Sequence, residues 1–131
     1  MPSRPMNFRL AFAMPCALAL SCLAAYAQQP PLVTEFPADA KETTPDDLRP
    51  RLAGKTFRYA IGTTDIRLQF QDSYAFVNFG QNNDTGPWRV EGSKLGVDWK
   101  RIPANCSEMR VAGDAIYMKR VSTGEVLKIT P

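Results

Sequence analysis

The sequence contains no histidine among its 131 residues. This absence excludes Ser-His-Asp and Cys-His catalysis, because both depend on an imidazole that takes up and returns a proton near neutral pH. It also excludes metal sites that are built on histidine, and the chain has too few cysteines for a cysteine-only zinc site. We therefore expect neither a metal nor a cofactor.

The N-terminal segment predicts a cleavable secretory signal peptide over residues 1–27. Its first nine residues include two arginines and no acid, residues 10–25 carry no charge, and Ala25-Tyr26-Ala27 forms a small-x-small cleavage site. A membrane anchor is the alternative, but this apolar run is shorter than the roughly 20 residues of a span and contains Pro15. We expect a periplasmic or secreted protein that is cleaved near Ala27.

Cysteine becomes scarcer still after such a cleavage. Cys16 and Cys22 leave with the signal peptide, so Cys106 has no partner for an intramolecular disulfide. Because free cysteines are among the most buried residues, we predict that Cys106 is a buried free thiol. A second possible cut lies before Cys22, which would then carry a lipid anchor, although Ala19 stands where such sites normally have leucine.

Neither sign of charge dominates the rest of the chain. The signal peptide holds two of the 16 lysines and arginines, so 14 basic residues remain against 13 acidic ones, a net charge of +1. This balance gives no reason to expect binding to nucleic acid or to an anionic membrane. The expected partner is an unknown protein or a small apolar ligand.

Two short segments precede the main domain. Residues 28–43 contain three prolines and predict a linker, or a tail that lies across the domain surface. Residues 44–54 predict a short helix with Thr44 as its N-cap. Leu48 and Leu52 are four residues apart, and we expect both to face the core.

From residue 55 onward, apolar residues recur at every second position, which is the period of a β-strand. The pattern predicts about eight short strands, and the tight turns between them favour antiparallel neighbours. We predict a single all-β domain over residues 44–131: an antiparallel meander that curls into a small barrel or half-barrel, with the short helix at one end. The polar stretch over residues 80–87 predicts a surface loop.

Aromatic residues are dense in this domain and supply the candidate ligand-binding residues. These candidates are Tyr59, Phe70, Tyr74, Trp88 and Trp99. If the barrel encloses a cavity, they would line a pocket for an apolar ligand, and if it does not, they fill its core. The size of these side chains favours the filled core.

Two groups of polar residues are candidates for a catalytic or a calcium site, and the sequence supports neither. Asp65, Asp72 and Asp98 could supply a pair of carboxylates for acid–base catalysis, but the sequence places no two of them together. The segment Asn82-Asn83-Asp84 offers oxygen ligands for calcium without the spaced carboxylates of a calcium loop. We assign no catalytic residue.

Five short motifs in this domain are Gly54-Lys55-Thr56-Phe57, Gly86-Pro87-Trp88-Arg89-Val90-Glu91-Gly92, Val97-Asp98-Trp99, Cys106-Ser107-Glu108-Met109-Arg110 and Gly124-Glu125-Val126. With them, residues 54–128 resemble small exported bacterial proteins of unknown function, of the DUF995 type. The resemblance implies a small periplasmic or secreted β domain and carries no established activity. It also implies a cysteine at the position of Gly96 that pairs with the later cysteine, which would explain why Cys106 is left unpaired here.

Three functions remain open. The leading hypothesis is an exported, non-enzymatic binding or interaction module of unknown ligand, because the chain has an export signal, one β domain and no catalytic motif. The first alternative is a carboxylate-dependent hydrolase that acts on envelope polysaccharide. The second is a carrier that holds a small apolar ligand in a barrel cavity.

Overall fold

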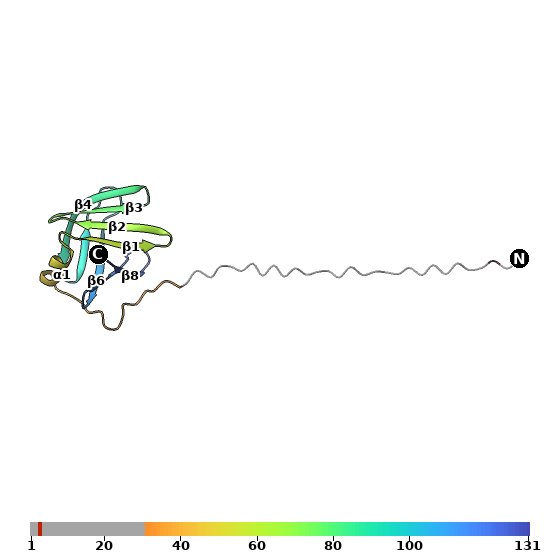
Figure 1. The fold of residues 1–131 in the computed structure, drawn as a ribbon, viewed down its shortest axis with the longest axis horizontal. Coiled ribbons are helices and arrows are strands. Elements are labelled where there is room, and N and C mark those ends of the chain that lie inside the picture. Colours follow the sequence, from red (N-terminus) through yellow and green to blue (C-terminus); the bar gives the residue numbers. More distant parts are fainter. Residues whose placement is uncertain (1–2, 4–30) are drawn as a thin grey trace. The chain divides into compact units, whose positions relative to one another are not determined.

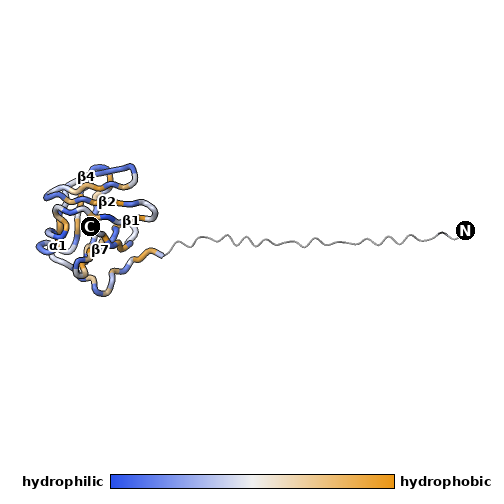
Figure 2. The backbone as a smooth tube through the Cα atoms, viewed as in Figure 1, coloured by the Kyte–Doolittle hydropathy of each residue, from blue (hydrophilic) through white to orange (hydrophobic). Residues whose placement is uncertain are grey.

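Apolar and polar residues alternate along the strands of this protein, and the alternation gives each strand one inner and one outer face (Figure 2). The structure, a computed structural model, describes Ser3 and residues 31–131 (Figure 1). The predicted signal peptide over residues 1–27, its cleavage site and the alternative lipid anchor at Cys22 lie outside the described residues. Within the part that is described, no helix has the length and hydropathy needed to cross a membrane.

Eight antiparallel strands follow one another in chain order, and each pairs with the next. They are β1 (Thr56–Ile61), β2 (Thr64–Phe70), β3 (Tyr74–Phe79), β4 (Asn82–Glu91), β5 (Lys94–Val97), β6 (Asn105–Ala112), β7 (Ala115–Lys119) and β8 (Val126–Ile129). Short turns make this order possible, and those at Gly62 and Gly92 use a left-handed backbone with φ of 59°, which glycine adopts without steric cost. The predicted all-β meander is confirmed.

The sheet curls until its first and last strands meet. Arg58 in β1 and Thr130, just after β8, exchange two backbone hydrogen bonds, with N···O distances of 2.6 and 3.0 Å. This contact involves one pair of residues, whereas consecutive strands pair over at least four residues each. The barrel is therefore nearly, but not fully, closed. Its inner face carries the buried apolar residues of the core.

The helix α1 (Pro45–Leu52) lies at one end of the barrel (Figure 1). Thr44 caps it as predicted, because its hydroxyl accepts a hydrogen bond from the backbone N–H of Asp47. Leu48 and Leu52 are fully buried in the barrel core, so the helix plugs this end. Pro50 inside the helix and Gly54 beyond it keep it to two turns.

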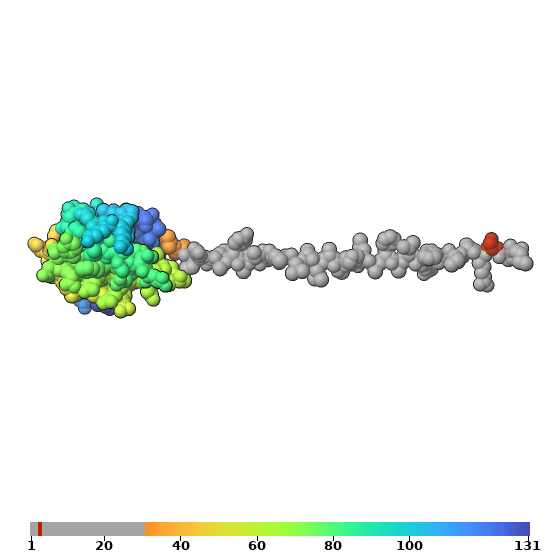
Figure 3. Space-filling view, turned by 90° about the horizontal axis from the view of Figure 1, so that it is seen from above, coloured from red at the N-terminus to blue at the C-terminus, as the bar shows by residue number. Residues whose placement is uncertain are grey.

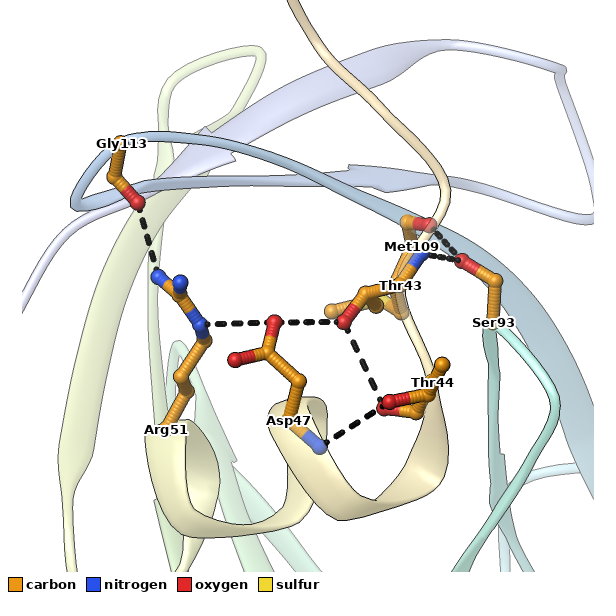
Figure 4. Close-up of polar contacts among 7 residues, drawn as sticks. All are labelled: Thr43, Thr44, Asp47, Arg51, Ser93, Met109 and Gly113. Carbon is orange, nitrogen blue, oxygen red and sulfur yellow. Dashed lines mark hydrogen bonds and ion pairs between the residues drawn. The ribbon is translucent and has the colours of Figure 1, made fainter.

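Side-chain contacts fasten α1 to the turns at the same end of the barrel (Figure 4). Arg51 donates to the carbonyl of Gly113 in the β6–β7 turn at 2.8 Å and pairs with Asp47 at 3.3 Å. The backbone N–H of Thr43 donates to the Ser93 hydroxyl in the β4–β5 turn at 3.1 Å. The plugged end is therefore the end that carries the β2–β3, β4–β5 and β6–β7 turns.

The described part of the predicted linker, residues 31–43, lies along the outside of the barrel. The carbonyl of Val33 accepts a hydrogen bond from the backbone of Val126 at 2.7 Å, and Lys41 exchanges two backbone hydrogen bonds with Val111. The ring of Phe36 lies 4.5 Å from the guanidinium carbon of Arg110, a cation–π contact. Of the two alternatives, the contacts favour a tail across the surface.

Two expectations about the surface are wrong. Residues 82–87 belong to β4 and pair with β3, so the expected loop over residues 80–87 shrinks to a turn at Gly80 and Gln81. The polar residues mislead because most of them point outward from a regular strand. Cys106 is exposed, and is not the buried thiol that we predicted. Its neighbour Ser107 faces the interior, and the alternation of the strand therefore turns Cys106 outward.

Candidate functional site

The half of the barrel next to α1 is filled with side chains. The rings of Phe57, Phe70 and Trp88 pack edge to face, with centroids 6.0 and 5.1 Å apart. The indole N–H of Trp88 donates to the carbonyl of Gln71 at 2.8 Å, so its polar atom is satisfied. Leu48 and Leu52 of α1 complete this packed layer.

The other half of the barrel is hollow. It holds a cavity of about 570 Å³ that is lined by residues of β1, β2, β3, β5, β6 and β7 and by two connecting loops. Most of the lining is apolar: Ile61, Ile66, Leu68, Val77, Phe79, Leu95, Val97, Ile102 and Met118. The loop that joins β5 to β6 contributes residues 99 and 102–104 to the lining, and the loop that joins β7 to β8 contributes residues 120–122. In a meander these connections lie at the end away from α1, so the cavity opens there.

Six polar side chains interrupt the apolar lining; Thr64, Asn105 and Ser122 are exposed, and Tyr59, Ser107 and Arg120 are not. Arg120 follows β7 and pairs with Glu125 at 3.3 Å, and both side chains are mostly buried. Burial raises the pKa of Tyr59 to about 12, against a smaller opposing effect of the Arg120 charge, so this phenol stays protonated near neutral pH. Ser107 is 6% exposed and presents its hydroxyl in the same hollow.

The predicted aromatic residues do not form one site. Tyr59 and Trp99 line the cavity. Phe70 and Trp88 belong to the packed layer near α1, and Tyr74 is on the outer face with 47% of its surface exposed. The two alternatives for the barrel, filled and hollow, therefore hold in different halves of the same interior.

Arg120 and Ser107 were missed in the sequence. Both positions have an apolar residue two places away on the inner face, Met118 for Arg120 and Met109 for Ser107. This alternation was the available signal, because it places an arginine and a serine on the inner face of strands that otherwise carry apolar residues there.

None of the described residues that line the cavity is an aspartate or a glutamate. Asp98 is exposed and pairs with Arg89 at 3.2 Å, while Asp65 and Asp72 are also exposed and line neither the cavity nor the groove described below. Across residues 31–131, no cluster of three or more cysteine, aspartate or glutamate side chains could hold a metal ion. The geometry gives the hydrolase alternative no pair of acids in this cavity.

Asp84 is buried, and its carboxylate has a structural role. It accepts hydrogen bonds of 2.8 to 3.2 Å from the backbone N–H groups of Thr85, Lys100, Arg101 and Ile102. Burial acts to raise the pKa of Asp84, but these four donors together hold it below its ordinary value. The carboxylate thus connects the segment after β5 to β4. Because its oxygens already accept these four hydrogen bonds, they are not available as calcium ligands.

The segment after β5 lies against β3 and β4 on one face of the domain (Figure 3). A shallow polar groove of about 480 Å³ runs beside it, between Phe76, Asn78 and Asn83 on one side and Lys100 and Arg101 on the other. This groove is separate from the apolar cavity, although Val77 contributes to both.

The fold and the cavity define the class of this protein as a small, nearly closed β-barrel with one hollow half. Comparison with known proteins finds no matching family model, no matching curated protein and no matching solved structure. The resemblance to exported proteins of the DUF995 type therefore stays a prediction.

Proposed function

We propose that this protein is an exported, non-enzymatic binding protein that holds a small, largely apolar molecule in the hollow half of its barrel. The single observation that carries the proposal is the apolar cavity of about 570 Å³. Binding sites for small molecules are typically about 300–1,000 Å³ in volume, and they combine an apolar wall with a few polar groups. This cavity has both properties, which favours the ligand carrier among the three functions.

The packed half of the barrel supports the same proposal. A small barrel can collapse onto its own side chains, and this one does so only next to α1. Because Phe57, Phe70 and Trp88 fill that half, they hold the strands in place while the opposite half stays open. A binding site on a rigid scaffold loses less conformational entropy when its ligand enters.

The proposal can be tested with N-phenyl-1-naphthylamine, a neutral apolar dye that fluoresces when it leaves water. We expect the full chain to bind the dye saturably with one site. A Val77→Phe variant places a larger side chain into the cavity, and we expect it to weaken dye binding about tenfold or more, because the displaced volume is part of the site.

The matched control is Asn78→Phe, the same new residue one position along β3, where the side chain is exposed. This variant should bind the dye as the wild type does. Both variants keep residues 1–30, so any dye that binds to this segment contributes the same background signal in all three proteins. Equal affinities in the wild type and in folded Val77→Phe, or no saturable binding to the wild type, would refute the proposal.

A further inference from the structure

Arg120 is a charged residue on the inner face of a barrel whose other inner residues are mainly apolar. It continues the inward series of Ile116 and Met118 along β7, and its side chain lines the cavity. A charge in such surroundings is costly unless it has partners. The position therefore calls for a negative group, and Glu125 is the one that the protein supplies.

Glu125 uses only part of the guanidinium. The contact is a single hydrogen bond from Nη1 of Arg120 to Oε2 of Glu125, 3.3 Å long, whereas charge-assisted pairs are usually about 2.7–2.9 Å. A guanidinium has five N–H donors, and the other donors of Arg120 form no hydrogen bond to the described residues. Arg120 thus has an unused edge that can bind a second carboxylate through two parallel hydrogen bonds.

Two of the hydroxyl groups that line the cavity, those of the less exposed residues, are also free to take part. Tyr59 and Ser107 both line it, and neither side chain forms a hydrogen bond within residues 31–131. Because the phenol of Tyr59 stays protonated, it can donate a hydrogen bond to an anion. Tyr59 and Arg120 line the same cavity.

We propose that the ligand is an apolar molecule that ends in a carboxylate, and that Arg120 binds this carboxylate while the apolar part occupies the wall formed by Leu68, Val77 and Val97. This inference rests on the proposed function and adds the chemical class of the ligand. A neutral alcohol of the same length would fill the same wall but would lose the charged contact, and a cationic end would meet the guanidinium.

Displacement of N-phenyl-1-naphthylamine by decanoate and by decanol tests the inference at neutral pH. We expect decanoate to bind the wild type about tenfold to a hundredfold more tightly than decanol, because hydrogen bonds to charged groups are the stronger ones. In Arg120→Gln the ratio of the decanoate affinity to the decanol affinity should fall by this factor, with both affinities measured in the same variant. Arg67→Gln is the matched control, since Arg67 is exposed on the outside of β2 and carries the same charge.

Two further variants distinguish the loss of the Arg120 charge from the effect of leaving Glu125 without its ion-pair partner. The double variant Arg120→Gln/Glu125→Gln leaves no unpaired carboxylate in the loop, and it should bind decanoate and decanol equally. Glu125→Gln removes the competing carboxylate, and it should bind decanoate severalfold more tightly than the wild type. Either a decanoate preference that persists in the double variant or a Glu125→Gln variant with no gain overturns the inference.

The same titrations distinguish this inference from the proposed function. If the wild type binds the dye and both decyl compounds with no preference for decanoate, the carboxylate assignment is wrong and the apolar site remains. If the wild type binds none of the three, both proposals fail.

Discussion

Gly96 and Cys106 face each other across β5 and β6. In the same register Ser93 lies opposite Met109, three positions further along the two strands. The backbone N–H of Met109 donates to the carbonyl of Ser93 at 2.8 Å, so Ser93 and Met109 form a hydrogen-bonded pair. Hydrogen-bonded and non-hydrogen-bonded pairs alternate along an antiparallel ladder, so Gly96 and Cys106 form a non-hydrogen-bonded pair. The Cα atoms of such pairs lie about 4.5 Å apart, a distance that a disulfide can bridge. We therefore predict that Gly96→Cys forms a disulfide with Cys106.

The expected gain in stability follows from the short loop that this disulfide closes. The loop-closure entropy of the unfolded chain gives about 3 kcal/mol for residues 96–106. A Cβ at position 96 would lie 2.9 Å from the guanidinium carbon of Arg89, so this side chain has to move. Arg89 is half exposed and its pairs with Glu91 and Asp98 are on the surface, so the displacement costs little. We expect a net gain of about 2–3 kcal/mol in the free energy of unfolding, or about 10–20 °C in Tm.

Urea unfolding of the oxidised and the reduced variant measures this gain, and mass spectrometry with thiol counting shows whether the bond has formed. Gly96→Ser is the control, because it adds a side chain of similar size without the thiol. In the wild type, the exposed Cys106 should react quickly with a thiol reagent under native conditions. If oxidised and folded Gly96→Cys still reacts at Cys106, or if oxidation leaves its stability unchanged, the register argued above is wrong.

Three other predictions follow from single contacts. Gly86→Ala should lower the free energy of unfolding by about 1–3 kcal/mol in urea titration, because its Cβ would lie only 2.0 Å from the carbonyl oxygen of Asp98; an unchanged midpoint would contradict this close approach. Because the pKa of Asp84 is lowered by folding, its contribution to stability should be present above about pH 4 and be lost as the pH falls through the folded pKa. Asp84→Asn should flatten this acid dependence in urea titrations at several pH values, and an unaltered profile would exclude the role of Asp84. Leu48→Ala should cost about 2–5 kcal/mol of stability, since this side chain is fully buried under the barrel end, and a cost below 1 kcal/mol would show that α1 does not plug the core.

Much of the fold could be predicted because each strand carries its own signal. In β2, Ile66 and Leu68 alternate with Arg67, and the turns between strands are short, so the meander follows from local patterns. The polar start of β4 could not be predicted in the same way. There, Asn83 and Thr85 face outward, and Asp84 is held inside by backbone donors from the segment after β5, a contact between residues far apart in the sequence.

Which inward-facing residues line the cavity depends on their position along the barrel axis. The alternation of apolar and polar residues predicts which side chains point inward, but it does not predict that position. Phe70 and Tyr59 both point inward, yet one lies in the packed half and the other lines the cavity. The difference comes from α1, because Leu48 and Leu52 enter from one end only and the aromatic rings of that end close around them.

Two polar residues at inward-facing positions near the open end make the cavity more than an apolar hollow. Arg120 and Ser107 occupy inner positions where an apolar residue would pack more cheaply. Replacing a partly buried ion pair with apolar side chains is often neutral or stabilising, so the Arg120–Glu125 pair does not serve stability in an obvious way. The proposed carboxylate ligand would give this charge a second partner, next to hydroxyls that have no hydrogen-bond partner within residues 31–131.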